Sequence, residues 1–351
     1  MGTAFEIRLP SGFFGATDLA CLALDRIDEL ENQLTIYRDD SEVSRLNAAA
    51  HLEPVRVEPG LFRLIARAVA IGRDTEGAYD VTSGALSAAW GFTRGPKRVP
   101  SPENLAEARS HTGSSHVKLD PDAQTIAFDR PGICINLGSI GKGYAIDQAT
   151  DVIRRSVWPV PALIHGGHSS IFALGSPPDS LAGRWRVSLR NPFDPERALG
   201  QFGLRDRGLG SSGAAFQRFE EGGRLYGHII DPRTGEPPRD GPESVTVLAP
   251  SAADADALST AFYLLGREWT ASYLADRPEI GAAFVESFSG GRSKILTTIN
   301  VSDSEFQPDI AILLESRNDL ARGHRVFRIL EASALIGNAS SRVSPIGGAL
   351  P

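Results

Sequence analysis

Residues 133–149, ICINLGSIGKGYAIDQA, constrain the fold more than any other stretch of this sequence. The first five residues alternate apolar and polar side chains, which predicts a β-strand over residues 133–137. Three glycines and a lysine come next: Gly138, Gly141, Lys142 and Gly143. A helix is then expected over residues 144–156, ended by the Trp-Pro pair that follows. The stretch therefore predicts a strand joined to a helix by a glycine-rich turn.

This arrangement is suited to a phosphate group, because glycines let backbone N–H groups approach an anion and a helix N-terminus adds partial positive charge. It is not a P-loop, since the spacing from Gly138 is too short and Gly143 stands where a Ser or Thr would bind magnesium. The glycine spacing does not fit a dinucleotide-binding fingerprint either. Two interpretations stay open at this point: a phosphate-binding turn, or a tight connection without a ligand.

Composition narrows the class of protein. The chain has 351 residues, of which 41% are hydrophobic and 23% charged, as in an ordinary globular protein of roughly one to three domains. The net charge of −7 and the lack of a basic run argue against a nucleic-acid partner. No apolar run approaches about 20 residues, so we expect no membrane segment. No signal peptide is recognisable, so we expect a cytoplasmic protein as written, or a periplasmic one if a leader was removed.

Hydrophobic periodicity places the other elements. Helices are expected over residues 17–34, 59–75, 85–90, 103–111, 252–265 and 269–274, with a short helix capped by Ser41. Strands are expected over residues 3–9, 55–57, 117–119, 125–129, 185–189, 225–231, 244–249 and 281–287, and as a pair within residues 163–174. Residues 209–213 read as a tight glycine-serine turn. After residue 290 only one amphipathic segment is expected, over residues 326–336.

The helix expected over residues 252–265 carries an acid among Ala, Leu, Phe and Tyr side chains. Asp256 and Thr260 are four residues apart and share a face, with Ser259 beside them. A carboxylate with hydroxyl groups is a hard-oxygen set that suits Mg²⁺, which keeps waters and takes substrate phosphate as a ligand. The alternative is structural: an acid favoured by the helix dipole, with Thr260 bonding back to the chain. Spacing alone favours this structural alternative.

Three histidines and two tyrosines are further candidates. His228 lies on an apolar strand before a proline turn, where it is either structural, a phosphate donor or a proton acceptor for a hydroxyl nucleophile. His165 and His168 flank a Gly-Gly pair, but no third metal ligand lies nearby in the sequence, so we favour structural roles. Tyr37 and Tyr79 could stack on a ring system, although a lone tyrosine more often belongs to the core or its rim.

The order of the motifs is more informative than any one of them. Along the chain stand Tyr-x-x-x-Ser-Glu-x-Ser-x-Leu-Asn (37–47), Gly-Ala-Tyr-Asp-Val-Thr (77–82), Trp-Gly-Phe (90–92), Gly-Lys-Gly-Tyr-Ala-x-Asp (141–147), Gly-Gly (166–167), Trp-Arg-Val (185–187), Ser-Ser-Gly (211–213), His-Ile-Ile-Asp-Pro-Arg-Thr-Gly (228–235) and Asp-Ala-Leu-Ser-Thr-Ala (256–261). Together they resemble the FAD:protein FMN transferase (ApbE) family from Met1 to about residue 288. The two last motifs are the most specific.

The resemblance implies a site. Mg²⁺ would be held by the backbone carbonyl of Ala145 and by Asp256 and Thr260, with Ser259 where some members place a further ligand. The positions that match FAD contacts are Met1, Tyr37, Ala78, Tyr79, Asp80, Lys142, Gln148 and Ile230. His228 matches a histidine implicated in the transfer step, and Asp80 is the second candidate for the general base.

The resemblance also implies an activity: Mg²⁺-dependent transfer of FMN from FAD to a threonine or serine hydroxyl of an acceptor flavoprotein, with release of AMP. Two alternatives remain: an FAD pyrophosphatase with the same site, and a flavin-binding protein without turnover. Several residues depart from the family pattern: Ser211, Ala214 to Phe216, His165 and His168. These residues cluster near the expected acceptor channel, so they put the acceptor's identity in doubt more than FAD binding.

The implied fold class is α+β: an ApbE-like (T-fold-type) architecture of two related α+β halves with largely antiparallel sheets and inserted helices. We expect one flavin transferase domain over residues 1–290. Residues 291–351 would form a C-terminal extension of unknown role, whose Gly/Ser/Pro-rich tail we expect to be partly disordered. The sequence leaves a homodimer open.

Overall fold

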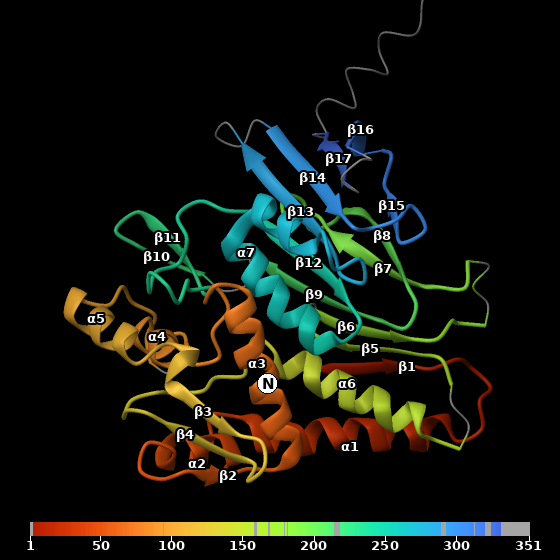
Figure 1. Ribbon diagram of the computed structural model, residues 1–351. Helices are drawn as coiled ribbons and strands as arrows, with labels where there is room; N and C mark the ends of the chain where they lie inside the picture. The colour runs from red at the N-terminus through yellow and green to blue at the C-terminus, as the bar shows by residue number, and fades with distance from the viewer. Residues whose placement is uncertain are drawn as a thin grey trace, which may run out of the picture.

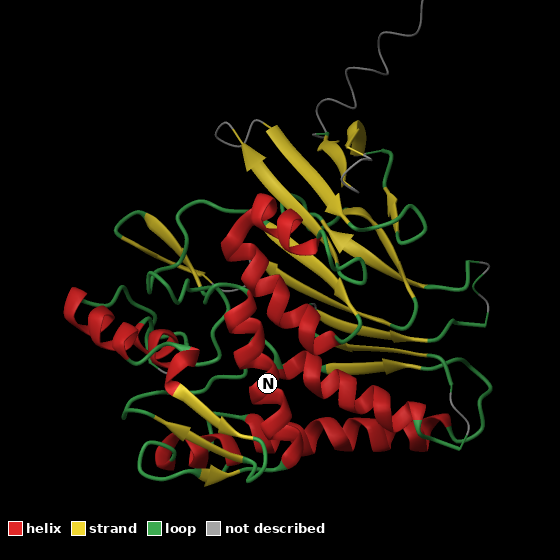
Figure 2. Ribbon diagram, viewed as in Figure 1, coloured by secondary structure: helices red, strands yellow, loops and turns green. Residues whose placement is uncertain are grey.

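The structure is a computed structural model that describes residues 3–93, 95–157, 160–167, 169–178, 180, 182–213, 218–288, 293–311, 313–319 and 324–330, without the side chains of residues 315–319. A nine-stranded sheet organises the chain (Figures 1 and 2). Its order is β1 (Phe5–Arg8), β5 (Ala162–Gly166), β6 (Ser170–Leu174), β9 (Arg207–Gly213), β12 (Ser244–Ala249), β13 (Gly281–Phe288), β14 (Ser293–Ile299), β17 (His324–Ile329) and β16 (Leu313–Asp319). Every neighbouring pair is antiparallel.

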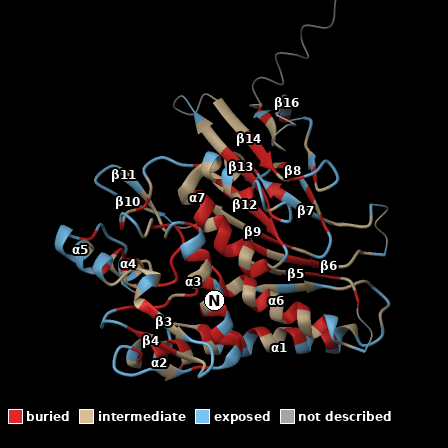
Figure 3. Cartoon of the chain, in the orientation of Figure 1, coloured by how far each residue is buried: buried red, intermediate tan, exposed pale blue. Residues whose placement is uncertain are grey.

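Helices cover one face of this sheet (Figure 2). Helix α6 (Gly141–Arg154) packs on β5 and β6, and α7 (Ala252–Leu274) packs on β9 and β12. Outside them, α1 (Ala16–Leu34) packs on α6, and α3 (Pro59–Asp74) contacts α7. The main core lies between these helices and the sheet, as the buried residues in Figure 3 show. Among the described residues, no helix is both long enough and apolar enough to cross a bilayer.

Smaller units surround this core. A three-stranded sheet of β15 (Phe306–Pro308), β8 (Ala198–Leu204) and β7 (Trp185–Arg190) shares a second core with the other face of the large sheet. Another three-stranded sheet consists of β2 (Val55–Arg56), β4 (Thr125–Phe128) and β3 (Val117–Asp120). The remaining elements are α2 (Glu42–Ala49), α4 (Gly84–Ala89), α5 (Pro102–Ser110), the 3₁₀-helix η1 (Ser114–His116) and the hairpin of β10 (Arg218–Glu221) and β11 (Arg224–Gly227). The α+β class with largely antiparallel sheets is confirmed.

The helix caps read from the sequence are also present. Ser41 accepts a hydrogen bond from the backbone N–H of Ser44 at the start of α2. Ser251 does the same for the N–H of Asp254 at the start of α7. The expected break at Gly266 is a kink with φ 78°, after which α7 continues to Leu274. Both caps satisfy backbone donors that have no partner inside the helix.

The strand expected over residues 133–137 does not form. The alternation of burial is real, since Ile133, Ile135 and Leu137 are buried, but the segment makes only an isolated bridge between Cys134 and Ser83. The Asn47 side chain replaces a neighbouring strand: its Oδ1 accepts from Ile135 N at 2.8 Å and its Nδ2 donates to Ile135 O at 2.9 Å. A side-chain amide therefore satisfies the backbone groups that a sheet would have paired.

The turn expected over residues 209–213 is wrong as well, because these residues belong to β9 in the middle of the large sheet. Glycines usually indicate turns, but here they let a helix approach the strand. A Cβ atom on Gly208 would lie 2.5 Å from Ala252 N, and one on Gly210 would lie 2.4 Å from the carbonyl carbon of Ala255. The pattern of β9 thus reflects packing against α7.

The described part of the C-terminal extension continues the large sheet. Strand β14 pairs with β13, and β17 and β16 follow it at the edge. The amphipathic segment expected over residues 326–336 overlaps β17, whereas residues 331–351 lie outside the described residues. A separate role for residues 291–351 and a homodimer stay predictions.

Candidate functional site

The candidate site forms where α7 lies on β9. Two residues of a strand and four residues of a helix both advance by about 6 Å, so contacts can repeat along the two elements. Gly208 faces Ala252, Gly210 faces Ala255, and Ser212 reaches the next helical turn. At the first two contacts, small residues bring the backbones of β9 and α7 together, and at the third contact the Ser212 hydroxyl fills the space between them.

Helices α6 and α7 are joined at their N-terminal ends. A Cβ atom on Gly143 would lie 2.1 Å from Ala252 O, so only glycine fits there without a shift. Asp147 of α6 accepts hydrogen bonds from Ala252 N at 2.8 Å and Ala253 N at 2.9 Å, the first N–H groups of α7. Burial raises the pKa of Asp147 to about 7, against the effect of the two N–H donors. Asp147 therefore caps a neighbouring helix.

The reciprocal contact comes from Asp256, on the second turn of α7. Its Oδ2 accepts from Gly143 N at 2.8 Å, and its Oδ1 accepts from the Ser170 hydroxyl at 2.6 Å. The Lys142 ammonium lies 3.9 Å from Oδ2. Burial raises the pKa of the Asp256 carboxyl, while Lys142 and the two hydrogen bonds oppose that shift. This carboxylate is 5% exposed, and its described partners are a cation, a hydroxyl and a backbone N–H.

Hydroxyl groups extend this set of oxygens. Ser212 Oγ lies 2.8 Å from Ser259 Oγ and 3.3 Å from Thr260 Oγ1. Ser259 Oγ also donates to the Asp256 carbonyl at 2.9 Å. Ser169 Oγ lies 3.3 Å from Ser170 Oγ, which holds the carboxylate. Lys142, Asp256, Ser259 and Thr260 thus gather around β9 and the β5–β6 turn.

The donor chemistry fits a magnesium ion. In the described part of the chain, no three His, Cys, Asp or Glu side chains lie close enough together to hold a metal. One carboxylate with several hydroxyl oxygens is instead an all-oxygen set, as Mg²⁺ prefers when waters and substrate phosphates complete its shell. Ala145 is buried in α6, with its carbonyl oxygen inside the hydrogen-bonded part of the helix. That oxygen would use its second lone pair for a metal.

The loop between α3 and α4 contains the next candidates. Asp80 Oδ1 accepts from the N–H and hydroxyl of Thr82, and Oδ2 accepts from Ser114 N at 2.7 Å. Both carboxylate oxygens therefore hold the loop in place. Ala78 and Tyr79 are fully buried. Burial raises the pKa of the Tyr79 hydroxyl, which lies near Ser139 without a well-formed hydrogen bond. A buried hydroxyl without a partner is costly, so a ligand that supplied one would stabilise this loop.

His228 follows β11 and lies beside a cluster of aromatic rings. Its ring meets Phe92 edge-on, with 6.4 Å between centroids, and Phe92 in turn contacts Phe219. Trp90 anchors the turn after His228, because its indole N–H donates to Gly235 O at 2.8 Å. Strand β11 ends at Gly227, so the expected strand over residues 225–231 stops one residue before the histidine.

The other matched positions are more scattered. Tyr37 is exposed, and Gln148 is partly exposed on α6. Ile230 is buried in the small core that contains Trp90. Met1, His168 and Ala214 to Phe216 lie outside the described residues. His165 faces away from the site and lies 3.3 Å from Glu6.

Sequence reasoning missed three members of this site. Ser212 was placed in a turn and Ser170 within the expected strand pair over residues 163–174, although each directs a hydroxyl toward α7. Asp147 belongs to a recognised motif but received no role. The sequence contains a pattern that could have identified Asp147: it stands four residues after Gly143, just as Asp256 stands four residues after Ala252, and both small residues lie at the start of a helix.

Comparisons with known proteins agree with this geometry. The family model described as the ApbE family matches residues 1–284. A relative from Haemophilus influenzae, named FAD:protein FMN transferase, is 32% identical over 279 residues, which cover 76% of this chain and 79% of that protein.

Solved structures are similar over most of their length. The crystal structure of the ApbE protein from Thermotoga maritima has a TM-score of 0.74 at 29% identity, covering 81% of this chain and 91% of that one. The apo form of the flavinyl transferase ApbE from Pseudomonas stutzeri has a TM-score of 0.73 at 29% identity, covering 87% of this chain and 92% of that one. The match of residues 1–284 and these shared structures show that the chain belongs to the ApbE family.

Proposed function

We propose that this protein transfers FMN from FAD to a hydroxyl group of an acceptor protein and releases AMP. The relatives named FAD:protein FMN transferase support this activity. The observation that carries it is the buried Asp256 carboxylate, placed among the hydroxyls of α7 and β9 with Lys142 beside it. A cation next to hard oxygen ligands is an arrangement suited to a pyrophosphate.

The residues of the candidate site would have different roles in this reaction. Asp256, Thr260, Ser259 and the carbonyl of Ala145 would hold Mg²⁺, which would offset the charge that develops as the P–O–P bond breaks. Lys142 would bind a phosphate oxygen, and the N-terminal turn of α6 would face the same anion. Ser170 and Gly143 N orient the Asp256 carboxylate. Tyr37, Ala78, Tyr79, Gln148 and Ile230, with Met1, would contact the rest of FAD.

The transfer step needs a proton acceptor. The acceptor hydroxyl forms a bond to the phosphorus of the FMN half, the bond to the AMP half breaks, and AMP leaves with the electron pair. The hydroxyl proton must pass to a base. We assign it to His228, because both oxygens of Asp80 already accept hydrogen bonds from Thr82 and Ser114. Threonine and serine are the hydroxyl side chains that such a site would flavinylate.

One experiment separates the activities. The purified protein is incubated with FAD and Mg²⁺, with and without an acceptor protein, while AMP and the acceptor mass are measured. AMP that appears only with acceptor, together with a mass gain of one FMN phosphoester, is the expected result. AMP without acceptor would mean an FAD pyrophosphatase. FAD binding without AMP in either tube would mean a flavin-binding protein and would contradict the proposal.

A binding experiment tests the metal site independently of turnover. Mn²⁺ can replace Mg²⁺ as a paramagnetic probe, and its binding is read from the loss of the free-ion signal in electron paramagnetic resonance. We expect Asp256→Asn to weaken Mn²⁺ binding strongly, whereas Asp254→Asn, two residues away and paired with Arg67, keeps it. Equal binding by both variants would contradict the assigned ligands.

A further inference from the structure

A groove of about 460 Å³ lies on the face of the large sheet opposite α7. Its floor includes Leu163 of β5 and Ile171 of β6, which belong to the second core. Their neighbours Ile164 and Phe172 point the other way, into the core below the helices. The groove is therefore separate from the site around Asp256. Strand β7 and the β7–β8 turn form its other wall.

The groove is positively charged, although the whole chain carries a net charge of −7. Four arginines and a histidine line it: Arg8, Arg186, Arg190, Arg197 and His165. Among the residues that the structure describes, Glu196 is the one acid in the lining. Glu6, next to the groove, pairs with Arg8 and His165. Within the described residues, Arg186 and Arg197 form no ion pair, so two guanidinium groups lack an acidic partner in the described structure.

One wall of the groove is the edge of a sheet. In the order β15-β8-β7, strand β7 pairs only with β8, so its other edge is open in the part of the chain that the structure describes. Val187 lines the groove from one face of β7, while Arg186, Ser188 and Arg190 line it from the other. A groove contacted from both faces of a strand runs along that strand's edge. An open edge offers unpaired N–H and C=O groups to an added strand.

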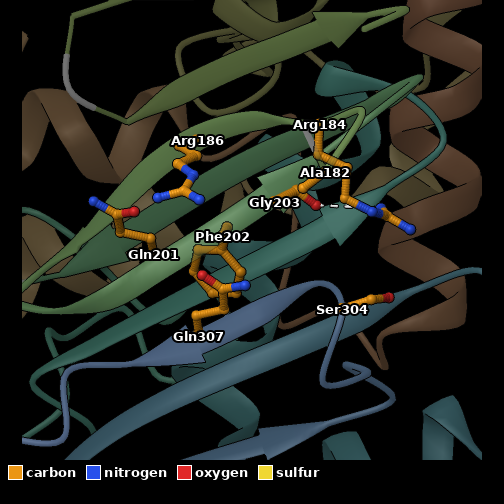
Figure 4. Close-up of a pocket in the computed structure, with 8 residues that line it drawn as sticks. All are labelled: Ala182, Arg184, Arg186, Gln201, Phe202, Gly203, Ser304 and Gln307. Carbon is orange, nitrogen blue, oxygen red and sulfur yellow. Dashed lines mark hydrogen bonds between the residues drawn. The ribbon is translucent and has the colours of Figure 1, made fainter. Parts of the chain in front are cut away.

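Figure 4 shows the outer surface of the same small sheet, next to the groove. Arg186 lies there beside Gln201 of the neighbouring strand, and Arg184 donates to Gly203 O at 3.3 Å. None of the eight residues drawn is acidic. Arg186 lines both this small pocket and the groove.

We propose that the groove binds an extended, acidic segment of the acceptor protein, which adds as a strand to the edge of β7. The arginines pair with acidic side chains, and the apolar floor takes the alternate side chains of the added strand. Among the described residues, no Phe, Tyr or Trp side chain lines the groove, which argues against a nucleotide stacked there. The inference rests on the proposed transfer function and names the chemistry of its partner.

The position of the groove fits this role. One end is at Gly167, in the turn between β5 and β6. Three residues later, Ser170 donates its hydroxyl hydrogen bond to Asp256. An acceptor anchored in the groove would thus have its next residues at the turn that borders the candidate site. The groove would hold the acceptor by its flanking segment and leave the target hydroxyl free to enter the site.

The first test measures binding and needs no turnover. The probe is a fluorescein-labelled octapeptide of alternating Asp and Val, followed by fluorescence anisotropy on the full chain. We expect it to bind, and Arg186→Glu/Arg197→Glu to raise its Kd by about tenfold or more. Arg205→Glu is the matched control, an exposed arginine outside the groove, and should bind like the parent protein. No binding to the parent, or equal binding to the double variant, would overturn the proposal.

Two further probes test how the peptide binds. A backbone N-methylated form of the octapeptide has the same charge but cannot donate hydrogen bonds along a strand edge, so we expect weaker binding. Equal binding would rule out strand addition. Inorganic phosphate at matched ionic strength should not displace the peptide. Displacement by phosphate alone would show a small-anion site instead and would also overturn the proposal.

Transfer kinetics with an acceptor protein whose target hydroxyl is still free connect the groove to the reaction. In Arg186→Glu/Arg197→Glu we expect the KM for acceptor to rise about tenfold, while the KM for FAD stays as the internal reference. An unchanged KM for acceptor would overturn the assigned role. If the protein binds the acidic peptide but never transfers FMN, the proposed function fails while the groove stands as a binding site, so the two failures are distinguishable.

Discussion

Asp147 and Asp256 occupy matching places on two packed helices, but their surroundings differ. Each follows a small residue by four positions, and each accepts hydrogen bonds from the first turn of the other helix. Asp147 finds only backbone N–H groups, from Ala252 and Ala253. Asp256 has one such donor, and Lys142 and Ser170 complete its surroundings. The same local geometry thus gives a structural cap on one helix and a candidate metal ligand on the other.

The difference shows what distinguishes a carboxylate committed to the fold from one that is free to bind a ligand. A carboxylate whose oxygens accept only backbone donors is committed to the fold, because moving it leaves those donors without partners. A carboxylate held by side chains and a nearby ammonium can exchange these partners for a metal and a phosphate. Substitutions at and around the two carboxylates test this contrast, and the largest effect is expected at Asp256.

The largest effect concerns the chemistry of Asp256. Asp256→Asn should lower Mg²⁺-dependent FMN transfer by about a thousandfold, because the amide is a poor ligand for a hard cation. The free energy of unfolding should change by less than about 1 kcal/mol, since the amide oxygen can still accept from Gly143 N. AMP release and urea denaturation measure the two quantities. Asp254→Asn serves as the control; retained activity in Asp256→Asn would refute the contrast.

The second effect concerns the point where the two helices touch. A Cβ atom on Gly143 would lie 2.1 Å from Ala252 O and 2.6 Å from Ala253 N, so Gly143→Ala must push α6 and α7 apart. We expect a loss of about 3 kcal/mol in the free energy of unfolding. Gly241→Ala is the matched control, because a Cβ there meets nothing within 4 Å. Equal stability of the two variants would show that the helices can separate freely.

The third effect concerns Asp147. Removing the carboxylate in Asp147→Ala leaves two N–H groups of α7 without their acceptor and should cost about 1–2 kcal/mol of unfolding free energy. Asp151→Ala, one turn further along α6 and paired with Arg154, should cost much less. At a temperature where Asp147→Ala and Asp151→Ala are both folded, the FMN transfer rate of Asp147→Ala should stay within about tenfold of that of the parent protein. A loss as large as that of Asp256→Asn would mean that Asp147 also takes part in the chemistry.

The smallest effect concerns Ser170. Ser170→Ala removes the donor to Asp256 Oδ1, so the carboxylate loses one of its orienting contacts. We expect a cost of about 1 kcal/mol in stability and a partial loss of transfer activity. Ser272→Ala, on the exposed end of α7, provides the comparison. An unchanged Mn²⁺ affinity together with unchanged transfer would show that Asp256 needs no support from β6.

Much of this molecule could be predicted from its sequence. The helices α1, α3, α6 and α7 follow from apolar periodicity and caps, which are local properties. The hypothesis that Asp256, Ser259 and Thr260 bind a metal rests on the family resemblance, because their spacing alone favoured a structural role, and it stays a prediction. Their convergence with Lys142 is visible in the structure.

The parts that escaped prediction depend on distant contacts. The glycines of β9 look like a turn because the helix that requires them, α7, lies about 40 residues later in the chain. The segment 133–137 looks like a strand because nothing near it in sequence shows that Asn47 will bind its backbone. The arginine groove gave no sign of a basic patch, because Arg8 lies far away in the sequence and acidic Asp194 and Glu196 stand between Arg186 and Arg197.

The reciprocal caps between α6 and α7 have a consequence for how the protein is made. A chain emerging from the ribosome exposes α6 more than a hundred residues before α7 exists, so Gly143 N and Asp147 have no partners during that time. Contacts this distant in sequence form late, because the intervening loop must close first. The candidate site is therefore among the last parts of the protein to assemble, and unfinished chains carry neither the candidate metal ligand nor the helix that presents it.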